Sequence, residues 1–402
     1  MKKQLEGVKV IDCSIYASAT LTTRILADWG AEVIHIEAPN GDPGRRGHLE
    51  ADYEAYDFEF YNINKKGIVL NMKEPRGMEV LDKLLESADV FVTNFRSKAL
   101  YKLGIDFEAI QKRHPHIVWA QITGYGDEGP EADAPGFDVV AWWARTGQTT
   151  DFVQPGESVL NAPIGYGDSL TGAMLAGGIS AALYNRTKTG VGERVSTSLY
   201  GTAAYAMYYT IASAYDGAVY PVSRKEPAAI PLKNSYKCAD GEWIYVSILD
   251  HERDYPKLCR MLGREDLIGD ERFNTLSPAQ KNCHALTDIL DDEFIKKGHD
   301  EWLKLLAEYG LPCSPLPHAA DIYKDPQSQA NHMVEEYKTR LGRTFMLPST
   351  PIRFGDNLPA ERYPAPRFGG EDTMEVLKAV GYREEDVAEL ERLGAVLVRR
   401  EG

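Results

Sequence analysis

The chain has 402 residues, which at ~150 residues per domain predicts two or three domains and a core that needs no disulfide or metal to hold it. Hydrophobic residues make up 43% and charged residues 26%, values typical of globular proteins, so collagen-like, fibrous and disordered classes are excluded. The 60 acidic and 45 basic residues leave a formal net charge of −15, which opposes broad binding to nucleic acid or an anionic membrane. This charge still allows a small polyanionic ligand where basic residues cluster.

In the N-terminal half, short β-branched runs alternate with helical patterns. Strands are predicted at 8–12, 32–36, 89–93 and 117–123, with helices at 20–29, 78–87 and 107–113. This alternation, with nearly continuous apolar strands, predicts an α/β fold with a doubly wound, Rossmann-like parallel sheet. Ligands of such sheets bind beyond the carboxyl ends of the strands, which here are followed by 13–18, 37–46 and 94–96.

Residues 169–184 and 199–215 are apolar nearly all round, typical of helices buried in a large core or at an obligate subunit contact. Beyond them an Asp240-Gly241 turn between two short β-patterns predicts a hairpin. Further helices are predicted at 255–262, 286–295, 301–308, 373–380 and 384–393. We therefore expect a discontinuous large α/β domain around a smaller α+β domain. The expected bounds are 1–215 for the N-terminal part of the large domain, 216–232 for a linker, 233–320 for the small domain, and 321–402 for a linker and the C-terminal part of the large domain.

The cysteines and the amino-terminal residues predict a cytoplasmic protein without a metal site. The five cysteines are scattered and contain no C-x-x-C pair, so neither a disulfide framework nor a zinc site is expected. Lys2 and Lys3 are followed by no apolar stretch, so we expect no secretory signal. The longest apolar run, 170–184, falls short of the ~20 residues that span a bilayer.

Residues 124–129 match the G-x-G-x-x-G fingerprint of dinucleotide binding, directly after a predicted strand. The fingerprint requires a helix next, whereas Pro130 and Pro135 with two acids between them predict an acidic loop. We therefore do not expect nicotinamide binding. The P-loop, H-E-x-x-H and G-x-S-x-G patterns are absent from the sequence, which removes the NTPase, zinc-protease and serine-hydrolase interpretations.

Asp168 follows Gly165 and Gly167 at the start of the long apolar pattern. One interpretation is an N-cap that accepts hydrogen bonds from the first-turn amides. The other is a nucleophilic carboxylate whose glycine flanks let a bulky acyl group approach. Spacing alone does not decide between the two.

A series of segments resembles the class III CoA-transferase family, in order and at family spacing over nearly the whole chain. These segments are 5–12, 25–37, 41–43, 64–66, 94–96, 121–126, 135–138 and Gly167-Asp168. Within the family, 93–101, 135–147 and the C-terminal tail resemble the branch that moves CoA onto 2-hydroxy acids such as phenyllactate and 2-hydroxyisocaproate.

The resemblance implies that Asp168 is the catalytic nucleophile. In such enzymes the aspartate attacks the thioester of a donor acyl-CoA to give a mixed anhydride, which the released CoA thiolate converts to an aspartyl-CoA thioester. The incoming acid then reverses these steps, so the free energy of the thioester is kept without ATP if water is excluded. Acyl-CoA and a small carboxylic acid are then the substrates, and no tightly bound cofactor or metal is expected.

The resemblance also implies which residues contact CoA. They are Ala17, Ser18, Leu70, Asn71, Met72, Lys73, Asn94, Phe95, Arg96, Lys102, Pro135, Gly136, Phe137 and Asp138. Basic side chains would supply a positive field for the CoA phosphates, although a solvated surface charge is the more common explanation for any single one of them. These are Arg45, Arg46, Lys73, Arg96, Lys98 and Lys102. Asn94 also fits a turn residue at the end of a strand.

Two departures from the family narrow the substrate. Formyl- and oxalate-type relatives carry a Gly-rich loop where this chain has 227–232 without glycine, so neither formate nor oxalate is expected. The racemase branch carries a histidine where this chain has Phe137, which leaves stereoinversion without its proton carrier. We therefore expect an aromatic or branched 2-hydroxy acid, with apolar pocket walls from Tyr16, Phe137, Trp142 and Trp143.

Two alternative functions remain from the sequence: an acyl-CoA racemase or epimerase on the same fold, and a CoA-binding or nucleotide-binding protein without turnover. The family further implies an interlocked homodimer, and its 2-hydroxy acid branch implies a dehydratase system as a partner. The connections at 215–232 and 311–330 are long enough to open the ring that interlocking requires.

Overall fold

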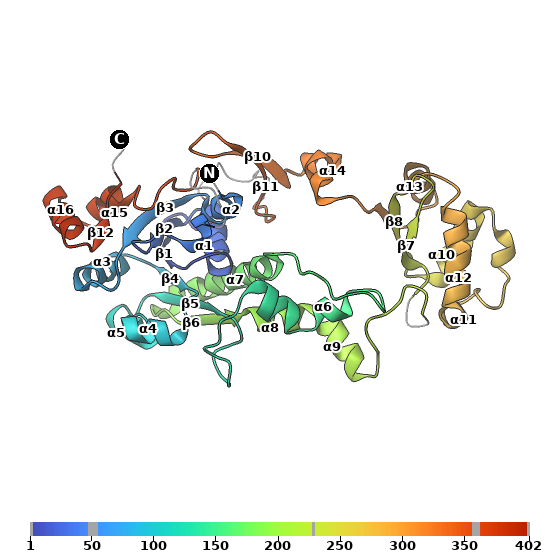
Figure 1. Cartoon of the computed structure of the whole chain (residues 1–402), viewed down its shortest axis with the longest axis horizontal. Coiled ribbons are helices and arrows are strands. Elements are labelled where there is room, and N and C mark those ends of the chain that lie inside the picture. The colour runs from blue at the N-terminus through green and yellow to red at the C-terminus, as the bar shows by residue number, and fades with distance from the viewer. Residues whose placement is uncertain (1–2, 47–54, 227–229, 356–361, 400–402) are drawn as a thin grey trace. The chain divides into compact units, whose positions relative to one another are not determined.

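The computed structural model describes residues 3–46, 55–226, 230–355 and 362–399 (Figure 1). The chain separates into two compact units. The first comprises Met1–Thr146, Ala162–Tyr208 and Tyr323–Gly402, and the second comprises Gly147–Asn161 and Tyr209–Ile322. The domain bounds expected from the sequence stay a prediction. None of the helices in the described ranges is long and apolar enough to cross a membrane.

The first unit is built on a seven-stranded sheet with the strand order β12-β3-β2-β1-β4-β5-β6. Its strands are β1 (Lys9–Cys13), β2 (Glu32–Glu37), β3 (Lys65–Leu70), β4 (Val90–Thr93), β5 (Val118–Thr123), β6 (Arg194–Ser198) and β12 (Val396–Leu397). All neighbours are parallel except β12, which pairs antiparallel with β3 at the edge. The chain proceeds outward from β1 to β3 and then, in the other direction, from β4 to β6. The order therefore reverses between β1 and β4, which is where such sheets bind their ligands.

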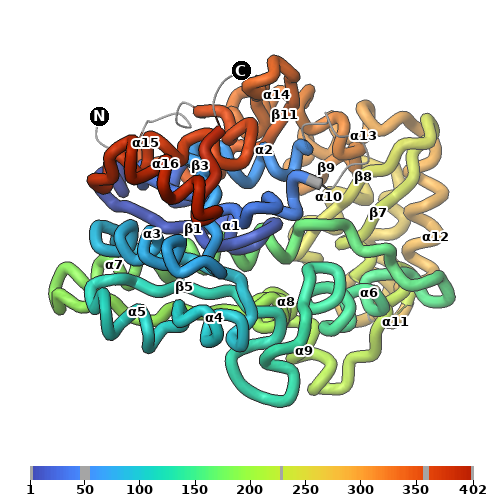
Figure 2. Tube along the Cα trace, turned by 60° about the vertical axis from the view of Figure 1, so that its left-hand side comes forward, coloured from blue at the N-terminus to red at the C-terminus, as the bar shows by residue number. Residues whose placement is uncertain are grey.

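Alternating side chains of β1, β2, β4 and β5 fill two cores, one on either face of the sheet. In β1, Val10 packs with the helices α1 (Ser18–Asp28) and α7 (Tyr166–Thr189), whereas Ile11 faces the opposite core. That second core includes helices from both ends of the chain (Figure 2). They are α3 (Pro75–Leu85), α4 (Ser97–Leu103), α5 (Phe107–Arg113), α15 (Thr373–Ala379) and α16 (Glu384–Arg392).

The remaining elements of the first unit are short. They are α2 (Tyr56–Asn62), α8 (Leu199–Ala206), α14 (Pro326–Ala330), the antiparallel pair β10 (Val334–Lys338) and β11 (Thr344–Pro348), the 3-10 turn Pro43–Arg46, and a π-helix at Asp138–Ala144. The 3-10 turn Ala319–Lys324 begins in the second unit and ends in the first. The second unit has its own core around an antiparallel sheet. It contains β7 (Lys233–Lys237), β8 (Trp243–Ser247), β9 (Cys313–Pro315), α6 (Gln148–Asp151), α9 (Tyr208–Tyr215), α10 (His251–Leu262), α11 (Leu276–Lys281), α12 (Cys283–Phe294), α13 (His299–Glu308) and the 3-10 turn Glu265–Leu267.

The structure confirms the predicted α/β fold with its mostly parallel sheet. It corrects the helix expected at 199–215, which is two helices, α8 and α9, with Met207 between them. A core location is wrong for α9, because none of its side chains is buried. Of α7, Leu170, Met174 and Tyr184 are exposed. Contact with a second subunit stays a prediction for these surfaces.

Candidate functional site

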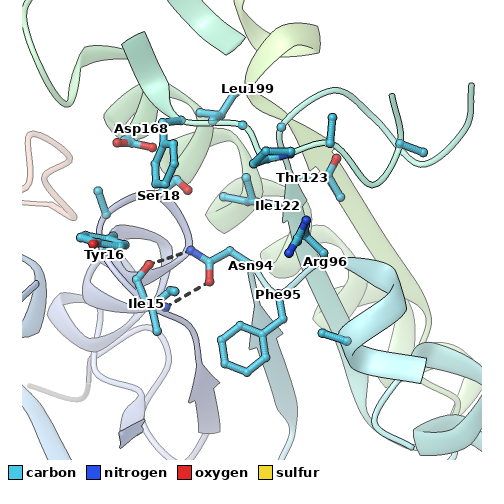
Figure 3. Close-up of a pocket in the computed structure, with 18 residues that line it drawn as sticks. Ile15, Tyr16, Ser18, Asn94, Phe95, Arg96, Ile122, Thr123, Asp168 and Leu199 are labelled. Carbon is cyan, nitrogen blue, oxygen red and sulfur yellow. Dashed lines mark hydrogen bonds between the residues drawn. The ribbon is translucent and has the colours of Figure 1, made fainter. Parts of the chain in front are cut away.

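A pocket of about 390 Å³ lies at the point where the strand order reverses (Figure 3). Its walls come from the residues that follow β1, β4 and β5, from the loop before the π-helix, and from the first turn of α7. The structure brings nine of the residues predicted for catalysis or CoA binding together here. They are Ala17, Ser18, Asn94, Phe95, Arg96, Pro135, Gly136, Phe137 and Asp168.

Five other predicted residues lie along β3 and its following turn or on α4, outside the pocket lining. Leu70 is fully buried in the core, and Met72 packs against the same core. The Asn71 amide donates to the Gly394 carbonyl at 3.1 Å, which ties this turn to the C-terminal part of the chain. Lys73 and Lys102 are exposed.

Of the basic residues expected to attract CoA phosphates, Arg96 is the one that lines this pocket within the described part of the chain. The Arg45 guanidinium is bonded to the Glu37 carboxylate, with Nη2–Oε1 at 2.7 Å, and stacks on Phe58. Lys98 Nζ pairs with Asp133 Oδ2 at 3.1 Å. The Arg46 side chain lies outside the described residues, as does 227–229 of the segment that replaces the Gly-rich loop.

Asp138 caps helix α7, although 27 residues separate it from Gly165. Its Oδ2 accepts from the Gly165 N–H at 2.6 Å and its Oδ1 from the Gly167 N–H at 2.9 Å. The N-cap position of α7 is Gly165, whose backbone is left-handed with φ +86° and which has no side chain to contribute. The cap interpretation of Asp168 is therefore wrong, and Asp138, expected at CoA, has both oxygens on backbone amides.

The glycines around Asp168 are needed for close packing. A Cβ on Gly167 would lie 2.2 Å from Trp142 Cγ and 2.3 Å from Asp138 Oδ1, so the cap and the indole already fill that space. A Cβ on Gly172 would lie 2.6 Å from the Ser18 carbonyl oxygen on α1. The expectation that Gly167 leaves room for an acyl group is thus corrected. Trp142 and Trp143, expected as pocket walls, are buried outside the lining because the π-helix turns them inward.

Asp168 is partly buried and lines the pocket. Burial, followed by the negative charge of Asp138, raises the pKa of Asp168 to about 7, against an opposing hydrogen bond from Ser18. The carboxyl group is therefore about half ionised near neutral pH. A carboxylate of raised pKa is also a stronger nucleophile than an ordinary aspartate.

Sequence reasoning missed Tyr61, which belongs to the unpredicted helix α2. Burial first, and then the charges of Asp168 and Asp57, hold the pKa of its phenol well above the usual range. The Tyr61 hydroxyl lies 3.3 Å from where a Cβ on Gly165 would stand, which places it at the start of α7. One tyrosine in an aromatic run carries no sequence signal for this position.

Comparison with known proteins shows the family of the chain. Residues 5–373 match CoA-transferase family III. The chain is 39% identical over 388 residues to (R)-2-hydroxy-4-methylpentanoate CoA-transferase of Clostridioides difficile, spanning 95% of this chain and 97% of the relative. It is 36% identical over 404 residues to cinnamoyl-CoA:phenyllactate CoA-transferase of Clostridium sporogenes, spanning 98% of each.

Solved structures of similar proteins show the same fold. Rv3272 of Mycobacterium tuberculosis superimposes with a TM-score of 0.81 at 28% identity, over 91% of this chain and 97% of its own. A CAIB/BAIF family protein from Brucella suis gives a TM-score of 0.78 at 26% identity, over 98% and 100%. The protein is thus an enzyme that transfers CoA. It belongs to CoA-transferase family III.

Proposed function

We propose that this enzyme moves CoA from an acyl-CoA donor to a free 2-hydroxy acid, with Asp168 as the covalent nucleophile. The observation that carries the proposal is that the two carboxylates, Asp138 and Asp168, have different roles. Asp138 binds the amides at the start of α7, and this leaves the Asp168 carboxylate on the pocket wall without a capping role. The first two curated relatives, named for a 2-hydroxy acid and for phenyllactate, support the acceptor class.

The reaction proceeds through three covalent intermediates on Asp168: the donor anhydride, the aspartyl-CoA thioester and the acceptor anhydride. An Asp168 oxygen attacks the donor thioester carbonyl, the C–S bond breaks, and the CoA thiolate leaves behind a mixed anhydride. The thiolate then attacks the aspartyl carbonyl of that anhydride, which releases the donor acid and forms an aspartyl-CoA thioester. The acceptor carboxylate attacks this thioester, and the freed thiolate finally attacks the acceptor carbonyl and restores Asp168.

The pocket residues support these steps by excluding water and by orienting the nucleophile. Ile15, Ile122, Leu199 and Phe137 supply apolar walls, which protect the anhydride from hydrolysis. The Ser18 hydroxyl interacts with the attacking carboxylate. The amides of Gly165 and Gly167 are engaged by Asp138 and therefore do not stabilise the oxyanion.

Chemical trapping tests the proposal. The enzyme is incubated with a donor acyl-CoA and hydroxylamine, and its peptides are analysed by mass spectrometry for a hydroxamate at Asp168. We expect this hydroxamate in wild-type protein and in Asp138→Asn, which keeps the nucleophile, and its loss in Asp168→Asn. Full turnover with an unmodified Asp168 peptide would overturn the covalent mechanism.

The acceptor class is tested separately with one donor and a panel of free acids. We expect branched and aromatic 2-hydroxy acids to accept CoA faster than the corresponding acids that lack the 2-hydroxyl group. A chain that prefers acids without a 2-hydroxyl group would remain a CoA-transferase but contradict the proposed substrate.

A further inference from the structure

Tyr16 occupies a backbone conformation that its side chain disfavours. Its φ is +59°, in the left-handed region, where a bulky residue is rare and is held only by its surroundings. The other described non-glycine residues with positive φ are Asn64 and His332. Asparagine and histidine occur in this region more often than tyrosine does, so Tyr16 is the most strained of the three.

Asn94 holds the residue before Tyr16 from the end of β4. Its Oδ1 accepts from the Ile15 N–H at 3.0 Å, and its Nδ2 donates to the Ile15 carbonyl at 2.7 Å (Figure 3). Both ends of one side-chain amide are thus bonded to one residue of the β1–α1 connection. The amide cannot turn toward a ligand without releasing Ile15.

Asp42 holds the same connection from its other side. The Tyr16 N–H points to Asp42 Oδ1 at 3.5 Å, a long contact, and this oxygen also accepts from the Gly44 N–H at 2.6 Å. Asp42 is 2% exposed, and its own N–H donates to Glu37 Oε2 at 3.0 Å. Ile15 and Tyr16 are therefore fixed between β4 and the turn after β2.

This arrangement presents the Tyr16 ring to the pocket beside Asp168. Tyr16, Ser18 and Asp168 follow one side of the pocket (Figure 3). The Tyr16 ring meets Phe137 edge to face, with centroids 6.2 Å apart. The two residues are 46% and 59% exposed, so their rings are open to an apolar ligand group.

We propose that Asn94 is a positioning residue, which keeps Tyr16 left-handed beside Asp168 so that Tyr16 and Phe137 select branched or aromatic acyl groups. The inference deepens the proposed function and rests on it, because it assigns this side of the pocket to the acyl group attached to Asp168. It differs from a direct contact between Asn94 and CoA, which the family resemblance implies.

A stability cycle tests the clamp without any activity. Asn94→Ala and Tyr16→Gly are made singly and together, and each melting temperature is measured. Glycine adopts positive φ without strain, so losing Asn94 costs the full value of its hydrogen bonds in the Tyr16→Gly background. In the wild-type background the relaxation of Tyr16 returns part of that cost, so the melting temperature should fall by roughly half as much there. Equal losses in both backgrounds would overturn the clamp. If Asn94→Ala does not fold, Asn94→Asp, which replaces the donor to the Ile15 carbonyl with a second acceptor, takes its place.

The kinetic test compares 4-methylpentanoyl-CoA with acetyl-CoA as donors to one acceptor acid. Asn94→Ala and Tyr16→Gly should each lower the ratio of the two kcat/KM values by about tenfold. Binding of free CoA, measured by calorimetry, should change less than about threefold. An equal loss for both donors together with much weaker CoA binding would overturn the inference, because Asn94 would then be a CoA ligand.

Asn64→Ala is the matched control for general destabilisation. Asn64 is also left-handed, bonds Asp28 and Tyr363 at 2.7 Å each, and lies outside the pocket lining. Its loss should lower the melting temperature and leave the donor ratio unchanged, and a changed ratio would overturn the inference. If the two substitutions are coupled in stability but no adduct forms on Asp168, the proposed function is overturned and the clamp stands. If an adduct forms but the two losses of melting temperature are equal, the clamp is overturned and the proposed function stands.

Discussion

Asp12 is a buried carboxylate and Asp168 a partly buried one, and the charged groups beside them have opposite signs. Asp12 in β1 is fully buried and pairs with Lys65 Nζ at 2.9 Å and with His35 Nδ1 at 3.0 Å. Burial alone would raise its pKa, but these two partners hold the pKa of Asp12 well below its usual range. For Asp168, burial and the charge of Asp138 act together and raise the pKa to about 7.

Burial by itself therefore does not determine the role of a carboxylate, because the charges of the neighbouring groups decide its pKa. Asp12 is paired with His35 of β2 and with Lys65 of β3, the strand beyond β2, so its carboxylate is already neutralised by two cations. His35 belongs to the same cluster: burial lowers its pKa, but Asp12 outweighs this and raises it to about 9, so the ring stays charged at neutral pH. Asp168 faces the pocket with a hydroxyl beside it, which leaves its electron pairs available.

The largest effect is expected from removing the carboxylate that faces the pocket. Asp168→Asn should lower kcat/KM by roughly 10⁴-fold or more, because the amide cannot form the anhydride. Steady-state transfer assays measure the loss, and calorimetry with free CoA shows whether the pocket is intact. Activity within about tenfold of wild type would remove the distinction between the two carboxylates.

Removing the carboxylate that is paired with cations should act on stability. Asp12→Ala leaves Lys65 buried without its anion and leaves His35 with Asp42 alone, at 3.4 Å, so the free energy of unfolding should fall by about 3–5 kcal/mol. Urea denaturation measures it. As a control, Asp127→Ala breaks a surface pair with Arg194 and should cost less than about 1 kcal/mol. If the two variants lose the same free energy of unfolding, the buried pairs of Asp12 contribute no more to stability than a surface pair does.

Asp168→Asn should also stabilise the protein, in a pH-dependent way. The folded-state pKa of Asp168 lies above its ordinary value, so ionisation of the native state is disfavoured, and its cost grows as pH rises from about 4 to about 7. The gain from the variant should therefore be nearly absent near pH 4 and reach on the order of 4 kcal/mol at pH 8. Thermal melts at both pH values check this. A gain that is independent of pH would point to packing instead.

The smallest effect is expected in the pH profile. The attacking species is the carboxylate, so kcat/KM should fall as pH drops below about 7, by about tenfold per pH unit. Ser18→Ala removes a hydrogen bond that favours the ionised form, and the midpoint should move to higher pH. A profile that stays flat down to pH 5 would show that Asp168 is an ordinary surface-like carboxylate.

The sequence predicted the sheet because its central strands are continuous apolar runs, and the family segments identified Asp168 and most of the pocket. β3 and β6 were missed because Lys65 and Lys66 begin one and polar residues fill the other, an edge strand. Asp138 as a cap and Asn94 as a clamp were not predictable from local pattern. Their partners lie 27 and 79 positions away. The parallel pairing of β1 with β4 brings Asn94 to Ile15, and the fold of the connection between β5 and β6 brings Asp138 to Gly165.

Transfer of oxygen-18 from the acceptor acid to the enzyme shows directly whether Asp168 carries the acyl and CoA groups. An acceptor acid labelled with oxygen-18 in its carboxylate is turned over once, and the aspartate peptides are weighed. We expect one labelled oxygen on Asp168 and none on Asp12 or Asp138, because the acceptor oxygen that bridges the anhydride stays with the aspartate when the thiolate takes the acceptor acyl group away as acyl-CoA. Normal turnover with no label on Asp168 would contradict it.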